Sequence, residues 1–205
     1  MSFKWLEWAQ KIQSISQAGL SFSKDIYELE RYEELRVLSL EIMEEYTGLE
    51  MEKIRGLFAN ETGYQTPKVD VRGAVFKDNR ILMVKEKVDD KWSLPGGFCD
   101  VGLSPSENIV KEIKEESGYE VHAKKLAALL DLNKHPHPPQ SHHYYKAFFL
   151  CELTGGQVGI GNETSAVKFF SENNLPELST GRNTKEQIEM LFSFYINPNK
   201  EAVFD

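Results

Sequence analysis

The sequence has few of the features that mark secreted or membrane proteins. Its two cysteines, Cys99 and Cys151, are far apart and form no C-x-x-C pair, so neither a disulfide framework nor a zinc site is indicated. No run approaches the roughly 18 apolar residues of a membrane span. The first residues lack a basic segment followed by an apolar core. We therefore expect a cytoplasmic protein with nothing cleaved and no membrane partner.

An excess of positive charge is also missing. The 205 residues include 24 Lys and Arg against 32 Asp and Glu, which gives a formal net charge of -8. Binding to a phosphate backbone normally relies on a basic face, so duplex nucleic acid is not an expected partner. If the protein handles phosphates, a bound divalent metal is the expected source of positive charge.

What is present is an ordinary globular composition, with 40% hydrophobic and 27% charged residues. The length allows one catalytic domain and a small appendage. From residue 3 to about residue 57, apolar residues recur at helical spacing. Gly19, the stretch 21–23 and Asp25 predict a break and a cap, and Gly48 predicts a second break. The apolar faces of these helices must bury against the rest of the chain or against a second subunit, and both remain open.

After residue 66 the pattern changes to short β-rich runs separated by turn residues. The order predicts an α+β fold with a mixed sheet and helices packed on it. We expect a helical N-terminal domain at 1–66, as a candidate dimerisation domain, and a catalytic domain at 67–205. Strands are expected at 69–76, 81–84, 120–132, 144–153 and 166–170, and helices at 104–117 and 184–195.

One predicted helix carries a dense set of glutamates. Ser104 is a good N-cap, Glu107 completes a capping box, and Gly118 ends the helix. Glu112, Glu115 and Glu116 follow at i, i+3 and i+4, a spacing that crowds like charges on one face. A hard divalent cation would stabilise this arrangement. The alternative is a solvated face with interleaved lysines.

The preceding loop favours the metal. Gly96 and Gly97 have no Cβ to obstruct a close approach of the backbone to metal or phosphate. Together the loop and the helix resemble the Nudix box: Gly, five residues, Glu, seven residues, then Arg-Glu-aliphatic-x-Glu-Glu-x-Gly-aliphatic. The positions that match in register are Gly97, Glu112, Ile113, Glu115, Glu116 and Gly118, after the family's usual lead-in Leu94-Pro95-Gly96-Gly97.

Three positions depart from the box. Leu103 stands where the first Glu belongs, Lys111 where Arg belongs, and Tyr119 where an aliphatic residue belongs. Arg can hold a carboxylate in a planar fork and Lys cannot, so the orientation of a metal-binding Glu must rest on other contacts. Because the three helical glutamates are retained, we expect an active enzyme with altered support around them.

The resemblance extends over nearly the whole chain to a branch with a short helical N-terminal domain, similar to the bacterial CDP-choline and ADP-ribose pyrophosphatases. It implies a Nudix α/β/α sandwich and a homodimer held partly by the N-terminal helices. It also implies hydrolysis of a nucleotide-derived small molecule, a nucleoside diphosphate linked to a second group. CDP-choline is the first expected substrate and ADP-ribose the next.

The same resemblance suggests catalytic roles. Glu112 and Glu116 are expected as the main ligands of Mg²⁺ or Mn²⁺, Glu115 as a ligand or base, and the Gly97 carbonyl as a further contact. Glu163 lies where Nudix enzymes often place an additional carboxylate and is a candidate general base; the alternative is an ordinary loop glutamate.

Substrate contacts are expected from the Gly96 and Gly97 backbone and from Arg72, although an outward-facing strand arginine is the alternative for Arg72. The segment 133–145 is rich in histidine and proline and predicts a loop at the mouth of the site, with contacts from His142 or Tyr144. A long surface connection is the plainer reading.

Trp92 and Phe98 are interpreted as packing residues beneath the loop. A non-hydrolytic nucleotide-sensing regulator on a Nudix fold is the second hypothesis, although no basic helix-turn-helix accompanies the domain. A helical interaction protein with a Nudix scaffold is the third. The choice of base, leaving group and metal stays open, because a few pocket contacts decide it.

Overall fold

The computed structural model describes residues 4–59, 62–140 and 142–205. Its contacts form two compact units, one of Met1–Pro67 with Pro139–His143 and one of Lys68–Pro138 with Tyr144–Asp205. The first unit is helical and the second carries a mixed sheet, which confirms the predicted fold class. The boundary expected between residues 66 and 67 stays a proposal, and the sequence does not mark the segment 139–143 as part of the first unit.

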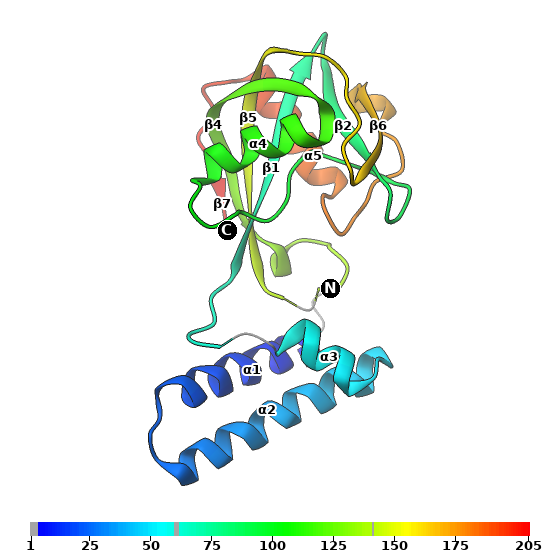
Figure 1. Ribbon diagram of the computed structural model, residues 1–205. Coiled ribbons are helices and arrows are strands. Elements are labelled where there is room, and N and C mark those ends of the chain that lie inside the picture. Colours follow the sequence, from blue (N-terminus) through cyan, green and yellow to red (C-terminus); the bar gives the residue numbers. More distant parts are fainter. Residues whose placement is uncertain (1–3, 60–61, 141) are drawn as a thin grey trace. The chain divides into compact units, whose positions relative to one another are not determined.

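The helical unit contains α1 (Lys4–Phe22), α2 (Ile26–Thr47) and α3 (Met51–Phe58), with α1 and α2 side by side (Figure 1). Asp25 caps α2 as predicted, because its side chain accepts hydrogen bonds from the backbone N–H groups of Tyr27 and Glu28. Gly48 ends α2 in the left-handed conformation at φ 67°. None of the helices in the described part of the chain is long and apolar enough to cross a membrane.

Gly19 does not break the first helix, contrary to the prediction. Helix α1 continues to Phe22, and a Cβ on Gly19 would lie 2.4 Å from ring carbons of Tyr32 on α2. The absent side chain makes room for this ring. Gly19 is therefore a contact point between two helices, a role that leaves its helical backbone intact.

The small core of this unit leaves part of α1 exposed. The buried side chains include Leu6 and Ala9 from α1 and Leu40 and Met43 from α2. An apolar stripe, which we define as Trp8, Ile15 and Phe22, stays exposed at 58%, 50% and 68%. These residues recur every seven positions and so share one side of the helix.

The second unit is built on one sheet in the part of the chain that the structure describes. Its strand order is β3-β2-β1-β5-β4-β7, and β6 also pairs with β2. Strand β1 runs parallel to β5 and antiparallel to β2. The bounds are β1 (Lys68–Lys77), β2 (Arg80–Glu86), β3 (Trp92–Ser93), β4 (Tyr119–Asp131), β5 (Tyr144–Gly156), β6 (Thr164–Phe170) and β7 (Val203–Phe204).

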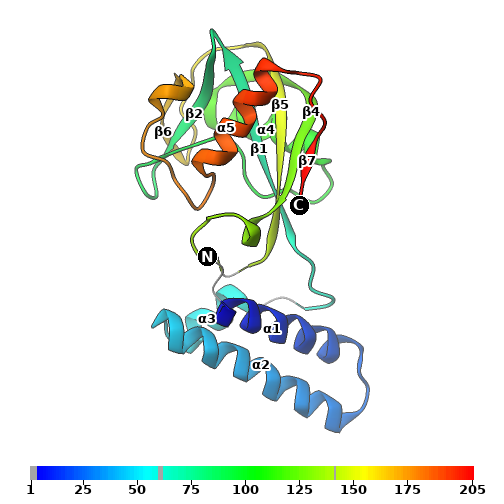
Figure 2. The same ribbon diagram turned by 180° about the vertical axis from the view of Figure 1, so that it is seen from behind.

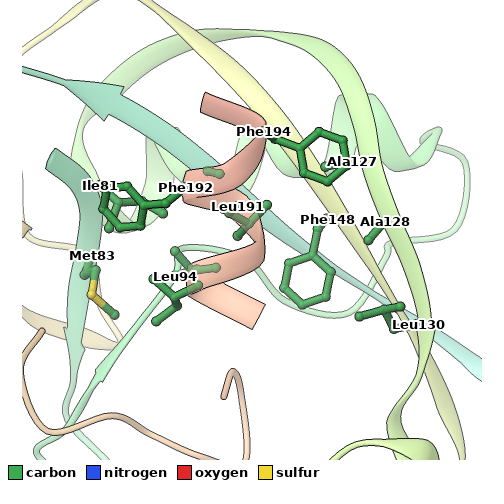
Figure 3. Packing of buried hydrophobic residues seen from close by; sticks show 12 residues of the cluster. Ile81, Met83, Leu94, Ala127, Ala128, Leu130, Phe148, Leu191, Phe192 and Phe194 are labelled. Carbon is green, nitrogen blue, oxygen red and sulfur yellow. The ribbon is translucent and has the colours of Figure 1, made fainter. Parts of the chain in front are cut away.

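Two helices cover the two faces of this sheet. Helix α4 (Pro105–Ser117) lies on one face and α5 (Lys185–Ile196) on the other, as opposite views show (Figures 1 and 2). Short 3-10 helices occupy Leu132–Lys134 and Glu172–Asn174. On the α5 side, Leu191 packs against Phe148 and Leu94 in a dry cluster (Figure 3).

On the α4 side, the contact with β1 is unusually close at Gly73. A Cβ on Gly73 would lie 2.6 Å from Ile113 Cδ1 and 3.1 Å from Ile109 Cδ1. Strand residues alternate between faces, so Val71, Gly73 and Val75 face α4 while Arg72 and Ala74 face the side of α5. The close approach of α4 to β1 therefore depends on the absence of a side chain at Gly73.

We expect Gly73→Val to destabilise the protein by roughly 1–3 kcal/mol, because the added methyl groups overpack the contact with α4. Urea unfolding checks this. The control is Gly56→Val, because a Cβ on Gly56 meets nothing within 4 Å. Equal unfolding free energies for both variants would show that the contact between β1 and α4 accommodates a larger side chain.

Candidate active site

Helix α4 begins and ends where the sequence predicts. Ser104 accepts from the Glu107 N–H while the Glu107 carboxylate accepts from the Ser104 N–H, which completes the capping box. Gly118 follows the helix at φ 75°. Asn108 is fully buried and accepts from the Asp100 N–H at 2.9 Å, so it ties the loop before the helix to the helix itself.

The glycine loop hydrogen-bonds to the first half of β1, on the side where β2 pairs only with the end of the strand. The Val71 N–H donates to the Gly97 carbonyl at 2.8 Å, and the Gly73 N–H donates to the Pro95 carbonyl at 2.9 Å. Gly96 has φ 140°, and a Cβ there would lie 2.0 Å from the Val71 carbonyl oxygen. Only glycine fits this position, so β1 fixes the backbone of the loop.

Two of the box glutamates face this loop. Glu116 is buried, and its carboxylate accepts a hydrogen bond from the Gly96 N–H at 2.9 Å. Burial raises the pKa of Glu116 to about 8. A Cβ on Gly97 would lie 3.3 Å from Glu112 Oε2, and burial also raises the pKa of Glu112. Glu116 is therefore buried and Glu112 partly buried, and both lie against glycine backbone.

Glu115 is more exposed than the other two, although it shares the Lys111 ammonium with Glu112. Its side chain is 57% exposed and pairs with Lys111 at 3.3 Å. Within residues 4–59, 62–140 and 142–205, no group of three His, Cys, Asp or Glu side chains is placed to hold a metal ion. The three carboxylates therefore differ in exposure, and the roles expected of them as metal ligands stay predictions. Inward packing of α4 selects Glu116 and Glu112, and Glu115 points toward solvent.

The remaining donors fit an open site for Mg²⁺ or Mn²⁺. Two carboxylates one turn apart supply hard oxygen ligands, and these ions keep several positions for water and substrate phosphate. Burial is the first cause of the raised pKa values of Glu116 and Glu112, and a bound cation would lower both. The Gly97 carbonyl already accepts from Val71, so any further contact would use its second lone pair.

Arg72 is buried, not outward-facing. Its guanidinium donates to Asp70 through Nη2 at 2.8 Å and Nε at 3.2 Å, and to the Leu94 carbonyl through Nη1 at 3.2 Å. Its predicted contact with substrate phosphate stays a prediction.

Three buried residues beside Arg72 were missed from the sequence. Lys146 is 1% exposed and its ammonium contacts the Asp70 carboxylate. Asn183 accepts from the Leu94 N–H at 2.7 Å, while its own Nδ2 has no partner in the described part of the chain. A signal existed for Asp70 and Lys146, because each interrupts an apolar strand at a position that should face inward.

Glu163 lies on a segment tied to the end of α4. In this segment the Thr164 hydroxyl donates to the Glu116 carbonyl at 2.9 Å and accepts from the Gly161 N–H at 2.9 Å. The Glu163 carbonyl accepts from the Lys87 N–H, and its side chain is exposed. The role of Glu163 as a general base stays a prediction.

The aromatic residues around the loop divide between packing and exposure. Tyr144 is buried, with its ring edge-to-face with that of Phe98 at 5.4 Å, and burial raises the pKa of Tyr144 to about 12. Trp92 packs on Phe170 as expected of a packing residue. Phe98 is 54% exposed, so it is not buried beneath the loop.

The histidine-rich segment is held by hydrogen bonds of His137, a residue for which the sequence analysis predicts no role. His137 donates through Nδ1 to the Thr180 carbonyl at 2.7 Å, so its Nε2 accepts from Gln187 at 2.9 Å. Both bonds suit a neutral ring. His142 belongs to the segment that groups with the helical unit, and its substrate contact stays a prediction.

His137 predicts a loss of stability in acid. Burial lowers the pKa of His137 from 6.5 to about 4, so between these pH values the unfolded chain binds a proton that the folded chain does not. We expect stability to fall as pH drops through this range, and to fall less in His137→Gln. Thermal unfolding across pH tests this, with exposed His122→Gln as control. Equal pH slopes for both variants would contradict it.

Two family models match the chain. Residues 3–58 match a model described as "UDP-X-like, N-terminal oligomerisation domain", and residues 66–192 match the NUDIX domain. A Bacillus subtilis protein named putative ADP-ribose pyrophosphatase YjhB is 57% identical over 98% of this chain and 97% of its own length.

Solved structures agree in fold. A crystal structure of a UDP-X diphosphatase has a TM-score of 0.65 and 38% identity, and the match covers 98% of each chain. An ADP-ribose pyrophosphatase from Streptococcus suis has a TM-score of 0.62 and 44% identity, over 68% of this chain and 100% of that one.

Proposed function

The chain belongs to the Nudix hydrolase family, and from that premise we propose that it hydrolyses the pyrophosphate linkage of a nucleoside diphosphate derivative with a divalent metal ion. The observation that carries the proposal is the placement of Glu112 and Glu116 against the Gly96–Gly97 backbone. One buried and one partly buried carboxylate beside glycine backbone suit an ion shared between protein and phosphate.

The reaction adds water across a P–O–P linkage. The water oxygen bonds to one phosphorus, the bridging P–O bond breaks, and a nucleoside monophosphate and a phosphate ester are released. When bound, Mg²⁺ or Mn²⁺ neutralises charge on the phosphate oxygens and lowers the pKa of the attacking water. Glu112 and Glu116 would hold the ion, with the Gly97 carbonyl as a further contact.

The chain's remaining residues bind substrate and move the proton. Glu163 is our first candidate to accept the proton of the attacking water and Glu115 the second, since both side chains are exposed and can reorient. The Gly96–Gly97 backbone would lie against a phosphate, and Tyr144 and His142 are proposed contacts to the rest of the substrate.

The sequence resemblance and the names of the similar proteins favour different substrates. The sequence resemblance places CDP-choline first, whereas the names of the similar proteins specify ADP-ribose and UDP-X. Each is a nucleoside diphosphate linked to a second group, so one reaction serves all. We propose ADP-ribose and CDP-choline as the first substrates to compare, in the cytoplasm and with either Mg²⁺ or Mn²⁺.

We also propose a homodimer formed through the apolar stripe of α1. Trp8, Ile15 and Phe22 would each bury apolar area in a self-complementary contact. The match of residues 3–58 to an oligomerisation domain supports this.

We expect Glu116→Gln and Glu112→Gln to lower kcat for ADP-ribose by roughly 100-fold or more, because each removes an anionic oxygen ligand. Phosphate-ester release with Mg²⁺ or Mn²⁺ is the measurement, and EDTA should abolish it. The control is Glu120→Gln, an exposed glutamate that pairs with Lys114.

Turnover that survives both substitutions would remove these glutamates from the mechanism. If the unsubstituted protein binds nucleotides without cleaving any of ADP-ribose, CDP-choline and UDP-glucose, the nucleotide-sensing regulator would replace the enzyme.

For the dimer, sedimentation should give a mass of two chains for the unsubstituted protein and one chain for Trp8→Glu with Ile15→Glu, because buried unpaired charge opposes association. Val88→Glu, at a side chain 77% exposed on the other unit, should leave the dimer intact. Unchanged helical circular dichroism confirms folding. A single-chain mass before substitution would refute the proposal.

A further inference from the structure

We propose that Thr164 and Lys87 are positioning residues that hold the segment 161–163 on the last turn of α4, so that the Glu163 carboxylate is kept beside the box glutamates of that helix. The inference rests on the proposed function, because it explains how a proton acceptor on a surface segment keeps its place.

Glu163 lies on the connection between β5 and β6, and its side chain is exposed. A proton acceptor must lie within hydrogen-bond reach of the water that it deprotonates, and a misplacement of about 1 Å can lower the rate about 100-fold. The role of Glu163 therefore requires contacts that fix the backbone on both sides of this residue.

Thr164, the next residue, fixes the segment on its inner side. Its side chain is fully buried. Its hydroxyl donates to the Glu116 carbonyl at 2.9 Å and accepts from the Gly161 N–H at 2.9 Å. The last carbonyls of a helix have no partner within the helix, so Thr164 satisfies one of them from 48 residues away. One hydroxyl thus joins the segment of Glu163 to the backbone of a box glutamate.

Gly161 brings the segment close to the helix backbone. A Cβ on Gly161 would lie 2.5 Å from the Glu115 carbonyl oxygen and 3.1 Å from Glu116 Cα. Any larger residue would push the segment away from α4. Glu163 therefore lies between two residues, Gly161 and Thr164, that both contact the backbone of the last turn of α4.

Lys87, in the turn after β2, fixes the same segment on its outer side. Its ammonium donates to the Asn162 carbonyl at 2.7 Å and lies 3.4 Å from the Gly161 carbonyl oxygen. The Lys87 N–H donates to the Glu163 carbonyl at 2.9 Å. Because these contacts reach three successive residues, they hold the segment along its whole length.

The pairing of β6 with β2 is irregular at the same place. Lys85 pairs with Ala166 and Glu86 pairs with Thr164, so Ser165 is an extra residue on β6. Such a bulge interrupts the alternation of side chains between the two faces, and bulges beside active sites redirect a side chain. Here the bulge follows Thr164 directly, where the hydroxyl has to reach α4.

Steady-state kinetics with ADP-ribose at saturating metal tests the inference. We expect Thr164→Val to lower kcat by about 10- to 100-fold and Lys87→Met by about 10-fold, because each loosens the backbone that carries Glu163. KM should stay within about twofold. Thr164→Ser keeps both hydrogen bonds and should retain about half of kcat or more.

A double-mutant cycle separates positioning from a general effect on the fold. Glu163→Gln should lower kcat by roughly 100-fold. In the Glu163→Gln chain, Thr164→Val and Lys87→Met should each lower kcat further by less than about twofold, because the segment no longer carries a proton acceptor. Mn²⁺ binding in calorimetry should stay within about twofold in both variants, because Glu112 and Glu116 keep their carboxylates.

The matched controls are Thr154→Val and Lys77→Met, at exposed residues of β5 and β1. Both should leave kcat unchanged. Circular dichroism and thermal unfolding check that each variant folds. Lys87 is exposed, so Lys87→Met decides the question if Thr164→Val does not fold.

The outcomes separate the alternatives. Unchanged kcat in folded Thr164→Val and Lys87→Met overturns the inference. An equal loss of kcat in the Glu163→Gln chain also overturns it and leaves both residues structural supports. Weaker Mn²⁺ binding in Thr164→Val overturns it in favour of an effect through Glu116.

The proposed function and the inference fail in different ways. If Glu163→Gln turns over as fast as the unsubstituted protein, the inference fails and the hydrolase stands, with Glu115 as the remaining candidate for the proton acceptor. If the unsubstituted protein cleaves none of ADP-ribose, CDP-choline and UDP-glucose, the proposed function fails and the inference falls with it.

Discussion

The docking of α4 on β1 is the constraint on which the rest of the site depends. Gly73 lets Ile113 approach the strand, and Gly96 lets the loop lie on the same strand from its edge. The helix and the loop thus both pack on β1. The hydrogen bond from the Gly96 N–H to the Glu116 carboxylate joins them. A rigid strand therefore sets the distance between carboxylate and glycine backbone, which is how a site gains precision from elements and not from flexible loops.

This arrangement disfavours the ionised carboxylates of Glu112 and Glu116 in the protein without ligand. Burial raises the pKa of Glu116 and Glu112, so the metal-free protein holds two carboxylates that favour protons or cations. Our proposal is that a divalent ion supplies the positive charge for phosphate binding in this chain of net charge -8.

Local patterns predicted the local structure well. The capping box at Ser104, the terminal Gly118 and the Asp25 cap depend on neighbours within a few residues, and each formed as expected. Pairings between distant residues were not predictable, because parallel pairing of β1 with β5 has no local signal in one sequence. Asp70 and Lys146 each interrupt an apolar strand, but their pairing with each other and the bond from Leu94 to Asn183 could not be predicted for this reason. Gly19 shows the same limit, since its role lies in a ring 13 residues away on another helix.

The most direct test of the central claim is anomalous scattering from crystals soaked in Mn²⁺. The account predicts a peak between the carboxylates of Glu112 and Glu116, beside the Gly96–Gly97 backbone. It also predicts no peak at the exposed Glu115 and Lys111 pair in the absence of substrate. A Mn²⁺ peak elsewhere, with none beside Glu116, would contradict the claim that this helix and loop form the metal site.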